Sequence, residues 1–263
     1  MEKNDDRLLL RKTEEKRNRR DSSNIMTNTM FMDPHGQSVV LSGYREIAAN
    51  PPVCGDLFDC AFLYGGYPDA ERKIAVFTPG YDVDFSGLLS VIRAEHSEKS
   101  SASVSGRALS HGDYLGALMG LGVKREVIGD ILVRPDGADI VVISDMADHL
   151  AEGLVKAGRS NLSTSVLSIG ELIVPARETK TIRDTVASLR LDNIVSSAFG
   201  ISRSKASEAI LSGLVFVNHI EQLKTDKQIS EGDLITLRHK GRARLAEIGG
   251  TSKKGRISVL IER

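Results

Sequence analysis

The first fifty residues of this 263-residue chain carry many Glu, Lys and Arg residues and few apolar positions at regular spacing. This pattern favours charged helices, with breaks expected at residues 33–36 and 50–52, where proline interrupts it. The first twenty residues have little apolar periodicity beyond Leu8, Leu9 and Leu10, so a frayed, solvent-facing helix is expected there. Residues 1–60 are therefore predicted to form a helical N-terminal region.

From about residue 61 to residue 169, short apolar runs alternate with amphipathic segments, which is typical of a mixed α/β unit. A Pro-Asp-Gly sequence at residues 135–137 predicts a hairpin turn between two of the strands. These features predict an α+β protein whose middle domain, residues 61–175, is ferredoxin-like or RRM-like. The expected strands are 73–78, 88–94, 130–133 and 139–144, and the expected helices are 112–120 and 147–157.

The last part of the chain, residues 181–263, predicts a pair of helices packed on strands. Leu191, Ile194, Val195 and Ala198 fall at the spacing of one helical face, and Gly200 is placed to end that helix. Ser202 is a natural N-cap for a second helix. Strands are expected at 214–218 and 233–238, and the connection to the middle domain is expected near residues 176–180.

Charge is distributed unevenly although the formal net charge of the chain is zero. Residues 177–263 contain 16 Lys and Arg against 10 Asp and Glu, whereas residues 1–176 contain 19 against 25. The basic end is thus the candidate for binding a polyanion. No apolar run is long enough for a membrane helix, the N-terminus is too charged for a signal peptide, and the two cysteines lack zinc-site spacing. A cytoplasmic protein without metal or cofactor is expected.

Basic residues are predicted to form one rim on the last domain. The helix pair leaves Arg190, Arg203 and Lys205 on its polar side, and three more cations follow the last predicted strand, namely Lys240, Arg242 and Arg244. Phosphates attract such a rim without any catalytic group, and arginine can donate two parallel hydrogen bonds to one phosphate. The pattern favours binding to structured RNA that depends strongly on salt and weakly on sequence.

The same residues resemble the RNA-binding domain named after ribosomal small-subunit protein four, which we write as the S-four domain. The resemblance lies in Arg190-Leu191-Asp192, Ser202-Arg203-Ser204-Lys205-Ala206, Gly213-Leu214-Val215-Phe216-Val217-Asn218 and Gly232-Asp233. It covers about a quarter of the chain, and His219 departs from it where a small turn residue is usual. The resemblance implies that Arg190 and Arg203 touch RNA.

Three further segments are similar to the YlmH family of bacterial proteins: residues 64–73, 111–130 and 241–256. This resemblance implies binding to ribosomal and transfer RNA on the large ribosomal subunit, assistance in the rescue of stalled translation products, and an association with cell division. The residues expected to contact RNA are Arg190, Ser202, Arg203, Ser204, Lys205, Asn218, Lys240, Arg242, Arg244, Lys253, Lys254 and Arg256.

Two other classes of function stay open on the sequence. The first is an RNA-modifying enzyme: Asp192 lies in the Arg-Leu-Asp context of a pseudouridine synthase, and Asp113 or Asp130 is an alternative catalytic carboxylate. Asp192 instead begins the first helix of the last domain, and Asp113 has the position of a helix cap beside His111. The second class is a protein-interaction adaptor acting through the acidic N-terminal two-thirds. A non-catalytic RNA-binding protein is the leading prediction, and its oligomeric state is not determined by the sequence.

Overall fold

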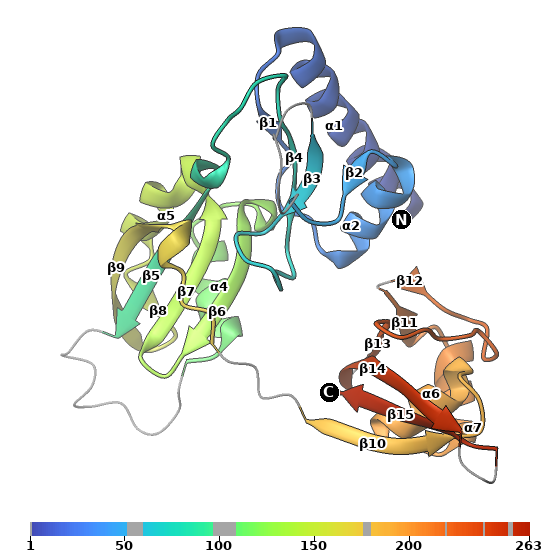
Figure 1. Ribbon diagram of the computed structural model, residues 1–263. Helices are drawn as coiled ribbons and strands as arrows, with labels where there is room; N and C mark the ends of the chain where they lie inside the picture. The colour runs from blue at the N-terminus through green and yellow to red at the C-terminus, as the bar shows by residue number, and fades with distance from the viewer. Residues whose placement is uncertain are drawn as a thin grey trace. The chain divides into compact units, whose positions relative to one another are not determined.

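The computed structural model describes residues 2–51, 60–96, 109–175, 180–218, 220–238, 240–251 and 255–263. The chain divides into two compact units, Met1–Ala176 and Arg177–Arg263, called here the N-terminal and C-terminal units (Figure 1). Each unit combines helices with antiparallel strands, so the predicted α+β class is confirmed. Within the described residues, every helix is too short or too polar to cross a membrane.

The N-terminal unit begins with a four-stranded sheet that takes strands from both sides of residue 60. Its strands are β1 (Thr27–Asn28), β2 (Ile47–Ala48), β3 (Ala61–Tyr64) and β4 (Ile74–Phe77), in the order β1-β4-β3-β2. Helices α1 (Glu2–Ser23) and α2 (Pro34–Gly43) accompany it. The boundary expected at residue 60 therefore falls inside a sheet, because β1 pairs with β4 and β2 pairs with β3.

Helix α1 is continuous and packed, so the expectation of a frayed helix is wrong. Leu9 packs against the buried cluster that contains Val40 and Phe77. The backbone carbonyl of Leu10 accepts a hydrogen bond of 3.0 Å from the hydroxyl of Tyr44. The leucines give the helix enough apolar surface to be held by tertiary packing, although its periodicity is weak.

A five-stranded antiparallel sheet follows, with the order β6-β7-β5-β9-β8 (Figure 1). Apart from a two-residue edge strand, the elements run along the chain as strand, helix, two strands, helix, strand, which is the predicted ferredoxin-like βαββαβ arrangement. The strand expected at 73–78 is instead β4 of the other sheet, and β9 takes the last place in this one. The strands are β5 (Leu89–His96), β6 (Ile128–Arg134), β7 (Gly137–Ile143), β8 (Lys156–Ala157) and β9 (Ser160–Ser168), and the helices are α4 (His111–Met119) and α5 (Ala147–Gly153). Short 3-10 helices are η1 (Ser86–Leu88), η2 (Arg125–Val127), η3 (Ser144–Met146) and η4 (Ile169–Glu171).

Helix α5 is shorter than the predicted range 147–157. It ends at Gly153, and Lys156 and Ala157 form β8, which pairs with the start of β9. Strand pairing at the sheet edge thus replaces the last turn of the expected helix.

The two faces of this sheet are covered by different parts of the chain. One face packs against α4 and α5, with Ile92, Ile140 and Val142 in the shared core. On the other face, Val91 and Val141 pack against Phe62, Ile74 and Val76 of the four-stranded sheet. The two sheets of the N-terminal unit therefore share a buried apolar layer.

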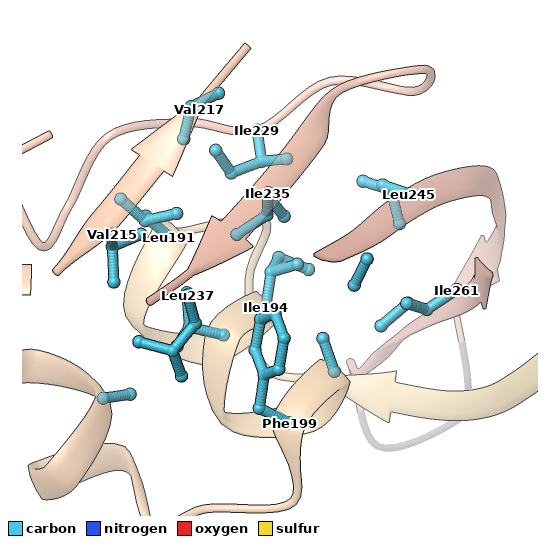
Figure 2. Close-up of a cluster of buried hydrophobic side chains, with 14 of the residues drawn as sticks. Leu191, Ile194, Phe199, Val215, Val217, Ile229, Ile235, Leu237, Leu245 and Ile261 are labelled. Atoms are coloured by element: carbon cyan, nitrogen blue, oxygen red, sulfur yellow. The ribbon is translucent and has the colours of Figure 1, made fainter. Parts of the chain in front are cut away.

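The C-terminal unit is a six-stranded antiparallel sheet in the order β10-β15-β14-β13-β11-β12, with two helices on one face. Figure 2 shows Ile194 and Phe199 of α6 directed toward Ile235, Leu245 and other buried side chains of the strands. The predicted helix pair and both predicted strands are confirmed. The elements are β10 (Thr181–Val186), α6 (Leu191–Phe199), α7 (Arg203–Leu211), β11 (Val215–Val217), β12 (Ile220–Glu221), β13 (Leu234–Leu237), β14 (Gly241–Thr251) and β15 (Ile257–Glu262).

A buried carboxylate fixes the hairpin between β6 and β7. Asp139 has no exposed surface, and it accepts two hydrogen bonds from Arg93, one from Arg134 and one from the N–H of Ile173. Burial by itself would raise the pKa of Asp139, but the hydrogen bonds from Arg93 and Ile173 and the charges of both arginines outweigh it and lower that pKa. The carboxylate therefore stays ionised in the folded protein.

We expect Asp139→Asn to lower the free energy of unfolding of the N-terminal unit by about 3 kcal/mol, because it leaves the arginine charges without their anion. Urea denaturation followed by tyrosine fluorescence measures this unit alone, since all five tyrosines lie within residues 1–176. Because the folded-state pKa of Asp139 is lowered, its contribution is present above the ordinary carboxyl pKa and disappears as pH falls through the folded value.

The matched control is Asp136→Asn. Asp136 is 68% exposed and pairs with the same Arg134 at 3.0 Å, so its loss should hardly change stability at neutral pH. Equal losses in the two variants would contradict the role given to the buried carboxylate.

Candidate nucleic-acid interface

The starts of α6 and α7 meet at the buried carboxylate of Asp192. This side chain lies in the first turn of α6 and accepts hydrogen bonds from Arg190, the N-cap of α6, at 3.2 Å from both Nε and Nη2. It also accepts bonds from Arg203, the first residue of α7, at 3.0 Å from Nε and 2.9 Å from Nη2. One anion therefore fixes two arginines that the sequence separates by twelve residues.

The electrostatics of Asp192 favour its charged form. Its residue is only 3% exposed, and burial alone would raise the pKa of its carboxyl. The hydrogen bonds from Arg190 and Arg203 outweigh this effect, so the pKa lies below its ordinary value. The ion pairs persist across the neutral pH range.

Both arginines bind Asp192 through the Nε side of the guanidinium, which leaves the other end of each group turned away from the carboxylate. Among the described residues, nothing bonds to the Nη1 atom of Arg190 or Arg203. Their side chains are 35% and 54% exposed, respectively. An arginine held in this way still offers donors to a phosphate, and less conformational entropy is lost when it binds.

The first turn of α7 adds hydroxyl groups and a further cation next to Arg203. Ser202 caps the helix by accepting the backbone N–H of Lys205 at 3.3 Å, and its hydroxyl lies 3.1 Å from that of Ser204. All of these side chains are exposed. The N-terminus of a helix favours anions, because unpaired N–H groups and the positive end of the helix dipole point outward there.

A polar groove of 460 Å³ lies between α6, the start of α7 and β10. Arg203 and Arg256 both line it, and Arg256 is held there by donating to the hydroxyl of Thr185 at 3.0 Å. One wall is the polar stripe of α6, formed by Asn193, Ser196 and Ser197. The structure therefore brings Arg256 to the helix pair, and we call Arg190, Ser202, Arg203, Ser204, Lys205 and Arg256 together the helix-side surface.

Arg242 and Arg244 do not join this surface, so the expectation of a single basic rim is wrong. Arg242 and Arg244 alternate along β14 with the buried residues Ala243 and Leu245, whose side chains face the helices. Successive residues of a strand point to opposite faces, so both arginines lie on the outer face of the sheet. Lys240 lies in the turn between β13 and β14.

Asn218 is exposed, and its side chain is engaged in a turn. Its backbone has a φ of 48°, its amide donates to Asp233 at 2.7 Å, and its side-chain oxygen accepts the N–H of Leu234 at 2.9 Å. The Asn218 and Gly232-Asp233 parts of the S-four pattern thus form one turn network. Lys253, Lys254 and His219 lie outside the described residues, as does Cys54.

The sequence does not by itself predict the wall of the groove, although a signal for it exists. Asn193, Ser196, Ser197 and Gly200 follow the same helical period as the apolar stripe of α6, but on the polar side. Small hydroxyl and amide side chains on a helix face are compatible with many environments, so this stripe alone did not predict a groove.

The candidate catalytic carboxylates are engaged in structural bonds. Asp113 completes the capping box of α4, with its carboxylate accepting from the backbone N–H and hydroxyl of Ser110 at 2.8 and 2.6 Å. Asp130 accepts the hydroxyl of Tyr67 at 2.7 Å and two backbone N–H groups. Together with the paired Asp192, these contacts account for all three carboxylates on which the enzyme alternative depends.

Comparisons with known proteins match both units. Residues 104–171 match a family model described as a putative RNA-binding domain in YlmH, and residues 189–235 match the S4 domain. The "Ribosome-associated protein quality control protein P2" of Bacillus subtilis (strain 168) is 35% identical over 242 residues, which cover 90% of this chain and 87% of that protein. The solved structure of "Cell division protein ylmH from Streptococcus pneumoniae" aligns with a TM-score of 0.46 at 22% identity, covering 64% of this chain and 94% of that one. With one third of its residues shared over nine-tenths of its length, the chain belongs to the YlmH family of proteins with a C-terminal S4 domain.

Proposed function

We propose that this protein is a non-catalytic RNA-binding factor that docks on folded ribosomal or transfer RNA through the helix-side surface. The observation that carries the proposal is the pair of arginines, Arg190 and Arg203, fixed by one buried carboxylate with their outer ends exposed. Double-stranded RNA presents phosphates and 2′-hydroxyls more readily than base edges, and a fixed guanidinium pair with adjacent hydroxyls matches such a surface.

Family membership supports the cellular setting. The relative from Bacillus subtilis is named a ribosome-associated quality control protein, and its match extends over both units of this chain. We extend that role to this protein, which would act in the cytoplasm on the large ribosomal subunit during rescue of stalled translation. An association with cell division belongs to the proposal by family membership alone.

Replacing both arginines, as Arg190→Ala with Arg203→Ala, is expected to weaken binding to a structured rRNA or tRNA fragment about 10- to 100-fold at low salt. The slope of log affinity against log salt should become shallower by about 2, because two phosphate contacts disappear. Fluorescence anisotropy over a salt series measures both quantities.

The matched control is Arg242→Ala with Arg244→Ala, which removes the same charge from the outer sheet face. A rigid duplex that lies on the helix side does not reach this face, so the control should lose much less affinity. If the two double variants lose affinity equally, only net charge matters and the helix-side surface is not the docking site.

A second experiment tests the positioning of the arginines separately from their charge. Asp192→Asn removes a negative charge, which by simple electrostatics would strengthen binding to RNA. We expect the opposite, a loss of about 3- to 10-fold, because an amide holds the two guanidiniums less firmly than a carboxylate. Anisotropy gives the affinity, and the melting temperature of the variant verifies that it is folded.

Asp226→Asn is the control for the direction of this change in RNA affinity. Asp226 is exposed and raises the pKa of Arg190 through its charge, without a hydrogen bond to it. Its removal should leave affinity unchanged or slightly increased. Strengthened binding in both aspartate variants would rule out positioning by Asp192.

A further inference from the structure

Two segments of the N-terminal unit, residues 67–72 and residues 125–130, meet at Asp130. The carboxylate of Asp130 accepts the hydroxyl of Tyr67 at 2.7 Å, the N–H of Glu71 at 2.7 Å and the N–H of Arg72 at 3.0 Å. These bonds fix residues 67–72 against the start of β6. They also bring Arg72 beside Arg125, which lies in η2 immediately before β6.

The guanidiniums of Arg72 and Arg125 share one backbone acceptor, and neither is hydrogen-bonded to a carboxylate among the described residues. Arg72 donates through Nε to the carbonyl of Ile128 at 3.0 Å and through Nη2 to that of Phe31 at 3.2 Å. Arg125 donates to the same carbonyl of Ile128 and to the backbone carbonyl of Gly129. Two half-buried positive charges thus lie side by side, and their printed hydrogen bonds all go to backbone carbonyls. The charges of Asp130 and Glu71 act on both arginines without a hydrogen bond to either.

The acidic groups around this pair are engaged elsewhere. Asp33 caps α2 by accepting the N–H of Gly36 at 2.8 Å. Glu126 lies 3.8 Å from the ammonium of Lys12 and 3.9 Å from that of Lys124. Asp130 accepts the three bonds described above. A further anion would therefore meet two guanidiniums that donate to backbone carbonyls and to no carboxylate among the described residues.

The energetic state of the arginines agrees with this geometry. Burial, followed by the repulsion from Arg72, lowers the pKa of Arg125 to about 10. Burial also lowers the pKa of Arg72. Lowered values mean that the charged forms are destabilised here, and a bound anion would relieve that destabilisation.

A cavity beside the pair is large enough for a nucleotide. It measures 370 Å³, and its polar lining consists of the cations Arg72, Lys124 and Arg125 and the carboxylates Asp33 and Glu126. It shares Leu9, Phe31, Met32 and Glu126 with a neighbouring cavity of 450 Å³ that runs along α1. The cationic end is thus continuous with a largely apolar stretch, which is a common arrangement of small-molecule sites.

We propose that Arg72 and Arg125 bind the phosphate group of a nucleotide, with the apolar stretch along α1 receiving its sugar or base. The phosphate belongs either to an RNA chain or to a free nucleotide, since both present the same group to the arginines. The site lies within the N-terminal unit and includes no residue of the helix-side surface, so each can fail without the other.

The test uses the full-length wild-type protein and the Nε–H resonances of its arginines in two-dimensional NMR. Inorganic phosphate, adenosine 5′-monophosphate and a short RNA hairpin are titrated separately. We expect saturable shifts of Arg72 and Arg125, and tighter binding of the nucleotide than of inorganic phosphate. Arg159, exposed in the turn between β8 and β9, should not respond. If none of the three probes shifts the two resonances, the arginines are only a structural brace and the proposal is wrong.

The source of the phosphate is decided with Arg125→Gln, compared with Arg159→Gln, which removes an equal charge from the same unit. If RNA supplies the phosphate, Arg125→Gln should weaken RNA binding about tenfold, whereas Arg159→Gln should not. Unchanged RNA affinity together with saturable shifts by the mononucleotide would assign the site to a free nucleotide. Should Arg125→Gln unfold, the wild-type titration alone still supports or overturns the phosphate site.

Discussion

The contact on which the C-terminal surface depends is the pairing of Asp192 with Arg190 and Arg203. Two guanidiniums at the starts of neighbouring helices would repel each other without an anion between them, and free arginine side chains would lose more conformational entropy on binding. The carboxylate removes both problems, because it neutralises part of the charge and fixes the orientation of each group. The cost of burying it is offset by the hydrogen bonds that it accepts, which keep its pKa low. Catalysis by this residue would require giving up those bonds.

The fold of the N-terminal unit limits how its ferredoxin-like domain can bind RNA. An open sheet face is the surface that an RRM-like domain uses, since aromatic side chains there stack on bases. Here that face carries Val91 and Val141, which are buried against Phe62 and Ile74 of the four-stranded sheet. Further along the same face, Asp139 accepts hydrogen bonds from Arg93 and from the backbone N–H of Ile173. Any RNA contact made by this domain must therefore use its edges, loops or grooves, as the Arg72 and Arg125 pair would.

Much of the fold follows from local sequence because its signals are strong. The apolar stripe of Leu191, Ile194, Val195 and Ala198 and the cap at Gly200, whose φ is 61°, specify α6 and its end without tertiary information. Strand β9 shows the opposite case. Its sequence is mostly Ser, Thr and Asn, and the side chains on one face are exposed, so no apolar run marks it. It becomes a strand because β5 offers it a partner, which is a property of the sheet and not of the segment.

The candidate site was predicted residue by residue but not as a surface. Arg190 and Arg203 can be named from their motif, whereas the sequence indicates Asp192 only as a helix start or a candidate catalytic residue, not as their common anion. The sequence groups Arg242 and Arg244 with them, because all four are basic and belong to the same domain. The alternation of β14, in which Ala243 and Leu245 are buried, places those arginines on the other face. Charge counted along a sequence cannot resolve this difference, because the face of a side chain depends on the register of its strand.

The number of cations on one face also limits what the C-terminal unit can do alone. The helix-side surface presents Arg190, Arg203, Lys205 and Arg256, so the slope of log affinity against log salt would be at most about −3.6 if each one neutralised a phosphate. Electrostatics on that scale supports weak, readily reversible binding at physiological salt. Stable and selective binding to a large folded RNA then requires contacts from elsewhere in the chain. Two linked sites bind the same RNA more tightly than either site alone, because the second contact is intramolecular. A two-unit protein with zero net charge and separate clusters of arginines is suited to this, because neither cluster alone attracts every RNA in the cell.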